Sequence, residues 1–442
     1  MYKNKKIFVL GMGKSGVASS KLLCHDNHIL LTDIKCDDYQ LMDDLEELGI
    51  NVVITDKQSE LLDDKFDLII KSPGIRTDNE VIIKARKLKI PVVNEVEVAY
   101  NMLPKNVKII GITGSNGKTT TTALAYEILK TAELPVKMGG NIGIPLSEIV
   151  SMVEENDVLV LEISSHQLID FQKFKTDISV LTNLSEVHLD MFGTYDKYKK
   201  NKLRIFEHHT SKDIAILNGK DQEVVRLTKD IPSKKIYFSS VEKADCYIED
   251  EKIYYHDEEV CNLNDIRLKG MHNYENVMCA IMIAKLFNVD NSIIKEALDK
   301  FSGVEHRIEF VRRLNEREFY NDSKSTNNSS TIVALSSFDT PILLLLGGLD
   351  RGQDFEELYE HMNFVKNVIC YGETKEKIKE FCDKHEINAT TVNNLEEATR
   401  LAYNLSEEGD TILLSPACAS WDQFKDFEER GKKFKDIVEE LS

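Results

Sequence analysis

Residues 108–120 read KIIGITGSNGKTT, and this stretch decides the fold of the middle of the chain. An apolar run breaks at Gly111, glycines recur at 114 and 117, and a helical pattern follows from about Thr119 to Thr131. This is the order strand, loop, helix. The glycines let the backbone N–H groups of the loop turn towards a polyphosphate, and the start of the helix adds partial positive charge at the same place. The stretch therefore predicts ATP binding. Five residues separate Gly111 from Gly117 where four are usual, and an ordinary turn is the alternative.

The residue types within this loop predict individual tasks. Lys118 supplies a mobile cation between the β- and γ-phosphates, and the Thr119 hydroxyl is a natural Mg²⁺ ligand. The residues that we expect to contact ATP here are Gly114, Ser115, Asn116, Gly117, Lys118, Thr119 and Thr120.

Length and composition limit the possible classes of protein. At 442 residues the chain is long enough for about three domains of ~150 residues each. With 75 acidic and 56 basic residues the formal charge is −19, which argues against a nucleic-acid partner and means that an anionic substrate needs a local basic pocket. The eight cysteines are scattered without a C-x-x-C pair, and no apolar run approaches the ~20 residues of a membrane helix. We therefore expect a cytoplasmic protein with reduced thiols and no membrane segment.

A second glycine turn lies near the start of the chain. Residues 11–16 read GMGKSG between an apolar strand and a helix, and Asp33 closes the next strand. This G-x-G-x-x-G unit is typical of a Rossmann-like fold. Its ligand stays open: a nicotinamide cofactor, a nucleotide-sugar diphosphate, or none if the turn is only structural. Residues 72–75, SPGI, end a further strand at the sheet edge where such folds bind ligands.

Strands and helices alternate through most of the chain, which predicts α/β domains with parallel sheets. Only residues 234–260, with short aromatic and β-branched segments, predict an antiparallel excursion. Polar segments near residues 101–106 and 303–305 mark two boundaries. We expect a Rossmann-like domain over 1–100, a central ATP-binding domain over 101–303 and a C-terminal doubly wound domain over 304–442.

Two polar residues follow apolar strands of the predicted central domain. Glu162 and His188 could both reach the mouth of the same sheet, where a carboxylate suits Mg²⁺. The alternatives are a capping or surface carboxylate for Glu162 and a satisfied structural histidine for His188.

Lys202 differs from the lysines around it. On a helix that begins near Tyr195, positions 198, 202 and 206 share one face with Tyr198 and Phe206, whereas Lys200 points elsewhere. A lysine on an apolar stripe loses hydration unless it snorkels to the surface or is chemically altered. Both alternatives stay open on these grounds.

Three polar junctions follow predicted strands in the C-terminal domain. They read DSKSTN at 322–327, GGLDRG at 347–352 and SPACAS at 415–420. Because the carboxyl ends of parallel strands meet at one edge of a sheet, we expect these junctions to form one rim that faces the phosphate loop when this domain closes. Each alone could be an ordinary turn.

At this point the motifs carry a resemblance that spans the whole chain in order. TGSNGKT, EISSHQL at Glu162, HNYEN at Asn273, EHR at Arg307, NDSKSTN at Asp322 and LSPACASWDQF at Leu414 together resemble the Mur ligases of peptidoglycan synthesis. The GMGKSG start and the SPGI segment resemble the member that adds D-glutamate. Two departures are visible, since Trp421 and Arg351 stand where other members carry leucine and lysine.

The resemblance implies roles for individual residues. It implies that Lys118, His188 and Lys202 are catalytic, that Thr119, Glu162 and His188 attend two Mg²⁺ ions, and that Lys202 is carbamylated by CO₂ and helps to hold one metal. The remaining implied contacts are Ser15, Asp33 and Gly74 with UDP, Asn141 and His188 with the muramoyl-alanine end, Asn276, Arg307 and Asp322 with the adenine nucleotide, and Lys324, Thr326, Arg351, Ser420 and Phe427 with D-glutamate.

The resemblance also implies a reaction. ATP and Mg²⁺ activate the carboxylate of UDP-N-acetylmuramoyl-L-alanine as an acyl phosphate, which the amine of D-glutamate attacks. It implies a monomer without nucleic-acid or membrane partners, and it implies that NAD is not used. The alternatives are another Mur-type or folylpolyglutamate-type ligase, a nicotinamide dehydrogenase, which leaves Lys118 without a task, or a nucleotide switch that hydrolyses ATP without an amino acid.

Overall fold

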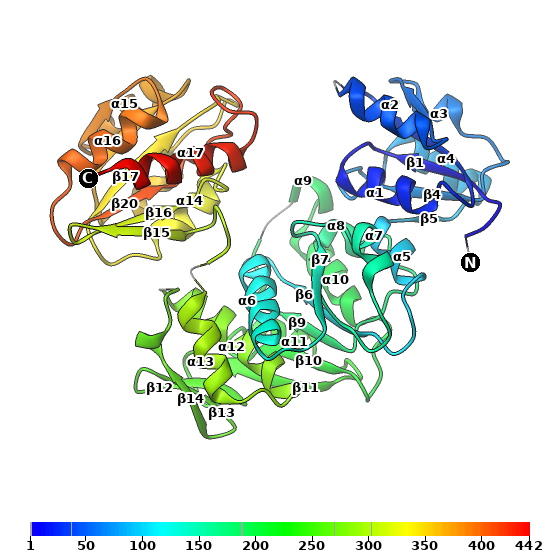
Figure 1. The fold of residues 1–442 in the computed structure, drawn as a ribbon, viewed down its shortest axis with the longest axis horizontal. Helices are drawn as coiled ribbons and strands as arrows, with labels where there is room; N and C mark the ends of the chain where they lie inside the picture. Colours follow the sequence, from blue (N-terminus) through cyan, green and yellow to red (C-terminus); the bar gives the residue numbers. More distant parts are fainter. Residues whose placement is uncertain (1, 37, 187–188, 269, 302) are drawn as a thin grey trace. The chain divides into compact units, whose positions relative to one another are not determined.

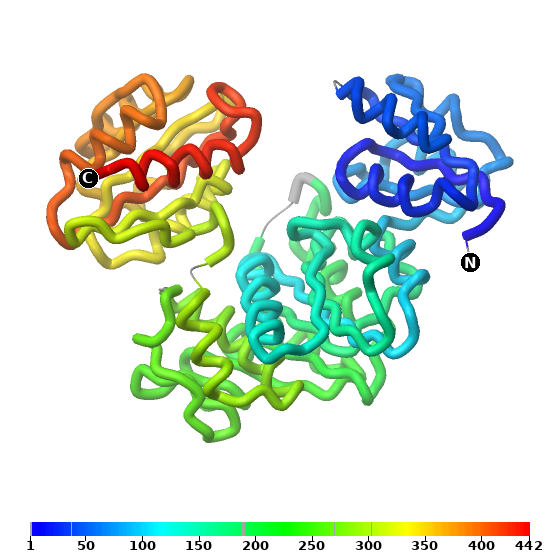
Figure 2. Tube along the Cα trace, viewed as in Figure 1, coloured from blue at the N-terminus to red at the C-terminus, as the bar shows by residue number. Residues whose placement is uncertain are grey.

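A computed structural model describes residues 2–36, 38–186, 189–268, 270–301 and 303–442. The chain forms three sheets and divides into two compact units, the first Met1–Leu263 with Glu275–Ala297 and the second Asn264–Tyr274 with Leu298–Ser442. Figure 2 follows the chain from its blue start in the first unit to its red end in the second. Of the residues expected to be functional, His188 lies outside the described part of the chain.

The N-terminal sheet is entirely parallel, with the strand order β3-β2-β1-β4-β5. Figure 1 labels β1, β4 and β5 of this sheet. Apolar side chains fill both of its faces, as expected for a parallel sheet covered by helices on each side. The chain reverses its direction of winding between β1 and β4, the place where such sheets bind ligands. The elements are β1 Lys6–Leu10, α1 Lys14–Leu23, β2 His28–Asp33, α2 Tyr39–Glu47, β3 Asn51–Ile54, α3 Gln58–Leu61, β4 Leu68–Lys71, α4 Glu80–Leu88, β5 Val92–Val93 and α5 Glu95–Tyr100.

The central sheet has the strand order β14-β13-β12-β11-β10-β9-β6-β8-β7. Strand β6 carries the phosphate loop and is the third strand from the β7 edge, so the loop opens between its neighbours β8 and β9. The elements are β6 Lys108–Thr113, α6 Lys118–Thr131, β7 Val136–Gly140, α7 Leu146–Ile149, η1 Val150–Met152, β8 Val158–Glu162, α8 Ser165–Leu168, β9 Ile178–Leu181, α9 Leu189–Phe192, α10 Tyr195–Lys202, η2 Leu203–Phe206, β10 Ile214–Asn218, α11 Gln222–Leu227, β11 Lys234–Ser239, β12 Cys246–Glu249, β13 Lys252–Tyr255, β14 Glu258–Asn262, η3 Leu263–Asp265, α12 Met271–Leu286 and α13 Asn291–Lys300.

Two expectations about this domain need correction. The strand does not break at Gly111, because β6 continues to Thr113 and Gly111 is a strand residue that gives room to the side chain of Thr176. The antiparallel excursion is shorter than expected, since β11 pairs in parallel with both β10 and β12, and only β12, β13 and β14 run antiparallel. Side-chain composition identifies a strand but does not fix its direction, which depends on the connection before it.

The third sheet has the order β15-β16-β20-β17-β18-β19, parallel except for the edge strand β15. Strand β17 is buried along its whole length, with apolar clusters on both sides of the sheet, so the doubly wound arrangement is confirmed. The elements are β15 Glu309–Leu314, β16 Arg317–Asn321, α14 Asn328–Leu335, β17 Ile342–Gly347, η4 Glu356–His361, β18 Val365–Tyr371, α15 Lys375–Lys384, β19 Ala389–Thr391, α16 Leu395–Leu405, β20 Thr411–Leu414 and α17 Phe427–Glu440.

The last helix, α17, was not expected from the sequence. It begins at Phe427 behind an Asp426 cap, whose side chain accepts a hydrogen bond from the backbone N–H of Glu429. Its buried face includes Phe434, Ile437 and Val438, and each such side chain contributes about 1.5–3 kcal/mol when fully buried. No helix among the described residues is long and apolar enough to cross a membrane.

Candidate active site

The phosphate loop is built by residues 114–117 between β6 and α6. Gly117 caps the helix at φ +81°, and a side chain there would collide with Asn276, so only glycine fits. Lys118 folds back over the loop, where its Nζ donates to the carbonyl oxygens of Gly114 and Ser115 at 3.0 and 2.8 Å. Its ammonium group therefore lies above the loop, where a phosphate would lie between the N–H groups and the cation.

Asn276 comes from α12, far from the loop in sequence, and still meets it. Its Oδ1 accepts a hydrogen bond from the Thr121 hydroxyl at 3.2 Å, one turn along α6. Residues 277–284 of α12 are buried on every side, which fixes the position of the helix and hence of Asn276. The structure thus brings Asn276 to the phosphate loop, as a nucleotide contact requires.

Glu162 ends β8 beside β6, with Ile112 as its register partner. Its side chain is 2% exposed: Oε1 accepts a hydrogen bond from Asn141 at 2.6 Å, while Oε2 has no hydrogen-bond partner. A buried carboxylate oxygen without a donor is costly unless a cation binds it, so Glu162 fits Mg²⁺. Thr119, buried at the start of α6, offers a hydroxyl oxygen at the same edge of the sheet.

The described residues alone do not complete a metal site. Among them, no three histidine, cysteine, aspartate or glutamate side chains gather as a metal-binding group. Mg²⁺ would therefore need the oxygens of Thr119 and Glu162 together with substrate oxygens, which is how Mg²⁺ is usually held beside phosphates.

Lys202 ends α10 and is 1% exposed. Tyr198 and Phe206 are buried with it and Lys200 is exposed, as the helical spacing predicts. Its Nζ donates to the Thr113 hydroxyl at 3.0 Å, so the alternative that Lys202 snorkels to the surface is wrong. Burial lowers the pKa of Lys202 well below its usual value; repulsion from Lys118 adds to this, and attraction to Glu162 opposes it.

The groups expected near UDP meet at the carboxyl ends of β1, β2 and β4. Asp33 accepts a hydrogen bond from the backbone N–H of Met12 at 2.7 Å, which fixes the glycine turn. The Ser72 hydroxyl donates to the carbonyl of Gly11 at 3.1 Å and joins this turn to the loop that carries Gly74. Gly11 has φ +99°, and a side chain there would approach the Ser72 hydroxyl to 2.7 Å. Ser15 belongs to the same glycine turn and lies in the first turn of helix α1.

In the second unit, Asp322 follows β16 and is fully buried. It accepts hydrogen bonds from the backbone N–H of Ile308 at 3.2 Å and from the Ser415 hydroxyl at 2.7 Å. Burial raises the pKa of Asp322 to about 6, although the Ser325 and Ser415 hydrogen bonds and the charge of Arg307 oppose the rise. The Nε of Arg307 is buried and has no hydrogen-bond partner among the described residues.

The residues expected around D-glutamate lie on the loops that follow β16, β17 and β20 of the second unit and at the start of α17. Lys324 Nζ lies 5.7 Å from the ring centre of Phe427. The Arg351 guanidinium lies 4.4 Å from the ring centre of Trp421, next to Ser420 in the chain. The loops after β17 and β20 are joined where Leu349 N–H donates to the carbonyl of Ala419 at 2.9 Å. Thr326 is half-buried in the Asp322–Asn327 junction.

Arg430 connects the loops that follow β16 and β20 and was missed by the sequence analysis. It is fully buried in α17 and donates to Ser323 Oγ at 3.0 Å, to the Ser323 carbonyl at 2.8 Å and to the Cys418 carbonyl at 3.0 Å. The signal was present, because Arg430 falls on the apolar face of α17 in the same way that Lys202 falls on the stripe of α10.

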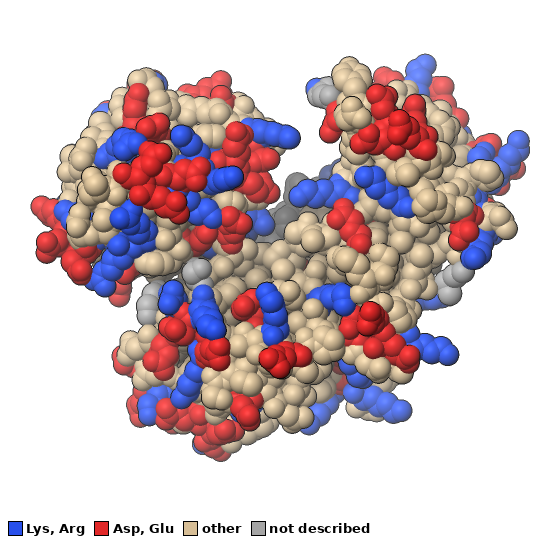
Figure 3. All heavy atoms as spheres, viewed as in Figure 1, with Lys and Arg blue, Asp and Glu red and all other residues tan. Residues whose placement is uncertain are grey.

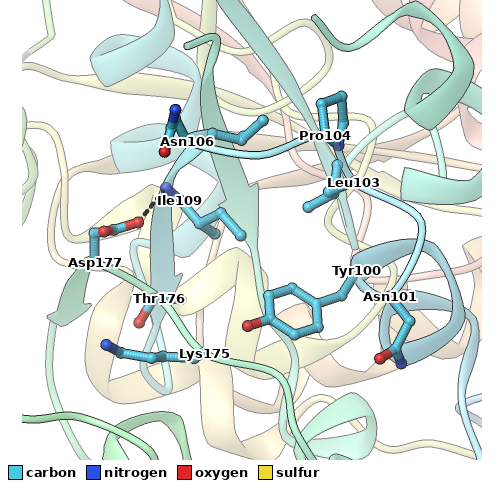
Figure 4. A pocket seen from close by; sticks show the side chains of 10 residues that line it. Tyr100, Asn101, Leu103, Pro104, Asn106, Ile109, Lys175, Thr176 and Asp177 are labelled. Carbon is cyan, nitrogen blue, oxygen red and sulfur yellow. Dashed lines mark hydrogen bonds between the residues drawn. The ribbon is translucent and has the colours of Figure 1, made fainter. Parts of the chain in front are cut away.

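A hollow of about 390 Å³ lies at the other end of β6, before its first residue (Figure 4). Figure 4 shows Tyr100 and Leu103 on one side and Lys175 and Asp177 on the other. The charged groups are already matched, since Lys175 pairs with Asp213 at 2.9 Å and Asp177 accepts from the Ile109 N–H at 2.9 Å. Because it lies at the start of β6 and the phosphate loop follows the end of β6, this hollow is separate from the phosphate loop.

The surface charge does not by itself identify a substrate site. On the face drawn in Figure 3, acidic and basic side chains are interspersed over each unit, on a chain of net charge −19. Anionic groups must therefore be held by the local donors described above, and those donors belong to the loops at the carboxyl ends of the strands.

Family comparisons match all three parts of the chain. Residues 5–94 match the "Mur ligase MurD-like, N-terminal domain", residues 112–284 the "Mur ligase middle domain" and residues 306–418 the "Mur ligase, glutamate ligase domain". The UDP-N-acetylmuramoylalanine--D-glutamate ligase of Geobacillus sp. (strain WCH70) is 43% identical over 447 residues, covering 100% of this chain and 98% of the relative. The protein of the same name from Bacillus mycoides (strain KBAB4) is 41% identical over 445 residues with the same coverage.

Solved structures share the fold at lower sequence identity. UDP-N-acetylmuramate-alanine ligase MurC from Thermotoga maritima superposes with a TM-score of 0.62 at 19% identity, covering 99% of each chain. MurF ligase from the same organism, solved in complex with ADP, gives a TM-score of 0.59 at 18% identity and covers 95% of this chain and 98% of its own. At these identities the likeness shows the three-domain α/β fold.

Proposed function

This chain belongs to the Mur ligase family, and from that premise we propose that it is the ATP-dependent ligase that joins D-glutamate to UDP-N-acetylmuramoyl-L-alanine. The reaction is a step of peptidoglycan precursor synthesis, and we place it in the cytoplasm, where ATP is supplied and where the eight unpaired cysteines stay reduced. The observation that carries the proposal is the group formed by the phosphate loop, the unsatisfied carboxylate oxygen of Glu162 and the buried amine of Lys202.

In the first step an oxygen of the alanyl carboxylate attacks the γ-phosphorus of ATP, the bond to the bridging oxygen breaks, and ADP leaves. Both reactants are anionic, so the step needs fixed positive charge between them. Lys118 supports this task, because its ammonium already lies over the loop carbonyls and can turn to phosphate oxygens. The N–H groups at the start of α6 point to the same place.

Mg²⁺, when bound, would screen the phosphate charge and polarise the γ-phosphoryl group. Thr119 and Glu162 would hold it, and Asn141 orients Glu162 through its 2.6 Å hydrogen bond. The lowered pKa of Lys202 favours the neutral amine, whose nitrogen would attack the carbon of CO₂ and release a proton to give a carbamate. The new carboxylate would turn a buried cation into an oxygen ligand.

In the second step the neutral amine of D-glutamate attacks the acyl carbon, the tetrahedral intermediate expels phosphate, and the amide nitrogen loses a proton. The amino acid brings two carboxylates to an acidic protein and needs several donors. Lys324, Arg351, Thr326 and Ser420 supply these donors in the second unit, with Phe427 as an apolar wall. Arg430 supports Lys324, Thr326 and Ser420 by joining the two loops that carry them.

The test measures phosphate release by the purified protein with UDP-N-acetylmuramoyl-L-alanine, ATP and one amino acid at a time. We expect release to require both the UDP substrate and D-glutamate, and L-glutamate to fail because the inverted carbon cannot present its three groups to the same donors. Equal rates with L-glutamate, L-lysine or L-alanine would show another member of the family. Release without any amino acid would show a nucleotide switch.

Two variants connect this assay to the site. Lys118→Ala should slow turnover by about 10² or more, with binding of the UDP substrate nearly unchanged, because the lost contacts are to ATP. Ser420→Ala should raise the KM for D-glutamate far more than the KM for ATP.

A further inference from the structure

Lys71 is a buried charge that the chemistry above does not use. It ends β4, its side chain is 0% exposed, and its Nζ lies 2.9 Å from Oδ2 of Asp170, whose side chain is 9% exposed. The same Nζ donates to the carbonyl of Ile75 at 2.9 Å and reaches the carbonyl of Ser72 at 3.5 Å. Lysine is rarely buried completely, and it stays charged there only with a carboxylate and other acceptors around it.

The carbonyls that Lys71 holds belong to the loop expected to contact UDP. Residues 72–75 form a tight turn, in which Ile75 N–H donates to the Ser72 carbonyl at 3.1 Å. Ser72 also binds the glycine turn of β1 through Gly11. Lys71 therefore contacts both ends of the 72–75 turn, and this turn contacts the first glycine loop through Ser72 and Gly11.

The carboxylate that balances Lys71 comes from the catalytic part of the central domain. Asp170 follows α8, a short helix that begins shortly after Glu162. A capping box between Ser164 and Gln167 stabilises the start of this helix. The backbone around Asp170 is fixed further by Arg204, whose guanidinium donates to the carbonyls of Leu168, Ile169 and Phe171.

A second contact in the same region joins the same two domains. Asn94 Nδ2 donates to the carbonyl of Gln167 at 2.5 Å, within α8. The Lys71–Asp170 ion pair thus lies at the contact between the loop expected to hold UDP and the segment that carries Glu162. Both partners belong to the same compact unit.

We propose that Lys71 is a positioning residue for the UDP substrate: it shapes the 72–75 loop, and through Asp170 it holds that loop in a fixed place relative to Glu162 and the phosphate loop. The inference rests on the proposed function. A UDP substrate bound on this loop has its reacting carboxylate at the far end, so a small shift of the loop becomes a large shift at the γ-phosphate. A pair that served only stability would have no such effect.

The experiment compares three variants of the full chain with the wild type. Lys71→Met removes the charge and keeps most of the length of the side chain. Lys71→Met with Asp170→Leu replaces both charges by apolar groups and restores a neutral, packed contact. Lys137→Met is the matched control, because Lys137 pairs with the buried carboxylate of Asp157 inside the central domain, away from the 72–75 loop. For each, we measure Tm, the three KM values, kcat and the Kd for UDP-N-acetylmuramoyl-L-alanine.

We expect both Lys71 variants to raise the KM and the Kd for the UDP substrate by about tenfold or more, with the KM for ATP and D-glutamate within about twofold. The double variant should regain the Tm that Lys71→Met loses without regaining substrate binding. Lys137→Met should lower Tm alone. If the double variant regains both Tm and binding, or if all three KM values rise together, the pair is only structural and the proposal is overturned.

These outcomes separate this inference from the proposed function. A wild-type protein that neither binds UDP-N-acetylmuramoyl-L-alanine nor ligates it removes the function and the inference together. A wild-type protein that ligates D-glutamate, with a double variant that binds the UDP substrate equally well, removes the inference alone. Should Lys71→Met fail to fold, the double variant still decides the question.

Discussion

Two lysines of the first unit are buried to the same degree and differ in what surrounds them. Lys71 has a carboxylate at 2.9 Å and two backbone carbonyls within 3.5 Å. Lys202 donates to a hydroxyl at 3.0 Å, with a second cation, Lys118, close enough to lower its pKa and with Glu162 as a weaker opposing influence. Burial alone therefore does not decide the role of a lysine: Lys71 is held in place by the acceptors around it, whereas the scarcity of acceptors around Lys202 makes that amine available for chemistry.

Asp170→Leu should have the largest effect on stability, because it leaves the Lys71 ammonium buried without its carboxylate. Removing one partner of a buried ion pair costs about 3–5 kcal/mol of unfolding free energy. Urea denaturation of the variant and the wild type measures the loss. A loss below about 1 kcal/mol would mean that the pair is solvated in solution and that the contrast with Lys202 is not real.

Lys202→Ala tests the other side of the comparison. We expect at most about 1% of wild-type turnover, since an oxygen ligand of the metal would be lost. Acetate should partly restore activity, because the missing group is a carboxylate, and native mass spectrometry of the wild type should show one added CO₂. Rescue by a small amine in place of acetate would mean that Lys202 works as an ammonium.

Glu95 extends the comparison to a buried acid without a cation. It is 1% exposed in α5; Oε1 accepts from the Ser147 N–H and Oε2 has no partner. Burial raises its pKa to about 7, and the Ser147 hydrogen bonds oppose the rise. Because its pKa is raised, Glu95 stays protonated to a higher pH in the folded state than in the unfolded state. Its contribution to the free energy of unfolding is therefore complete below about pH 4.5 and is lost as the pH rises to about 7.

Glu95→Gln should remove this pH dependence, which amounts to the order of 2–3 kcal/mol. Unfolding by urea at pH 5 and pH 8 measures it; Glu148→Gln, on the neighbouring α7, removes a charge whose repulsion adds to the rise and should reduce the pH dependence only slightly. An unchanged slope in Glu95→Gln would place the titration in another group.

Lys202→Met is the variant with the smallest expected effect on stability. Methionine has a similar length, and Thr113 keeps its hydrogen bond to the carbonyl of Ile163 at 2.7 Å. We therefore expect the unfolding free energy to stay within about 0.5 kcal/mol of the wild type or to rise, while activity is lost. A loss like that of Asp170→Leu would show that Lys202 is held by charge, as Lys71 is.

Sequence patterns were sufficient where the physics is local. The glycines and Lys118 predicted the phosphate loop, because a strand, a tight turn and a helix start need particular residues at adjacent positions. The helical spacing of residues 198, 202 and 206 predicted that Lys202 shares the apolar face of its helix, but it left open whether the amine snorkels to the surface, and only the structure shows that Lys202 is buried. Alternating strands and helices predicted three α/β domains, and the ranges proposed for them stay a prediction.

The tertiary structure alone decided which distant groups meet. Nothing in the local sequence says that Asn276 reaches the phosphate loop, that Lys71 finds Asp170 or that Arg430 holds the Ser323 and Cys418 carbonyls, because these contacts join residues on different elements. The direction of β11 and the end of β6 were likewise set by the neighbouring strands. Local spacing determines faces and turns, but the partner of a buried charge is fixed only when the sheets and helices pack, since burial makes an unpaired charge costly.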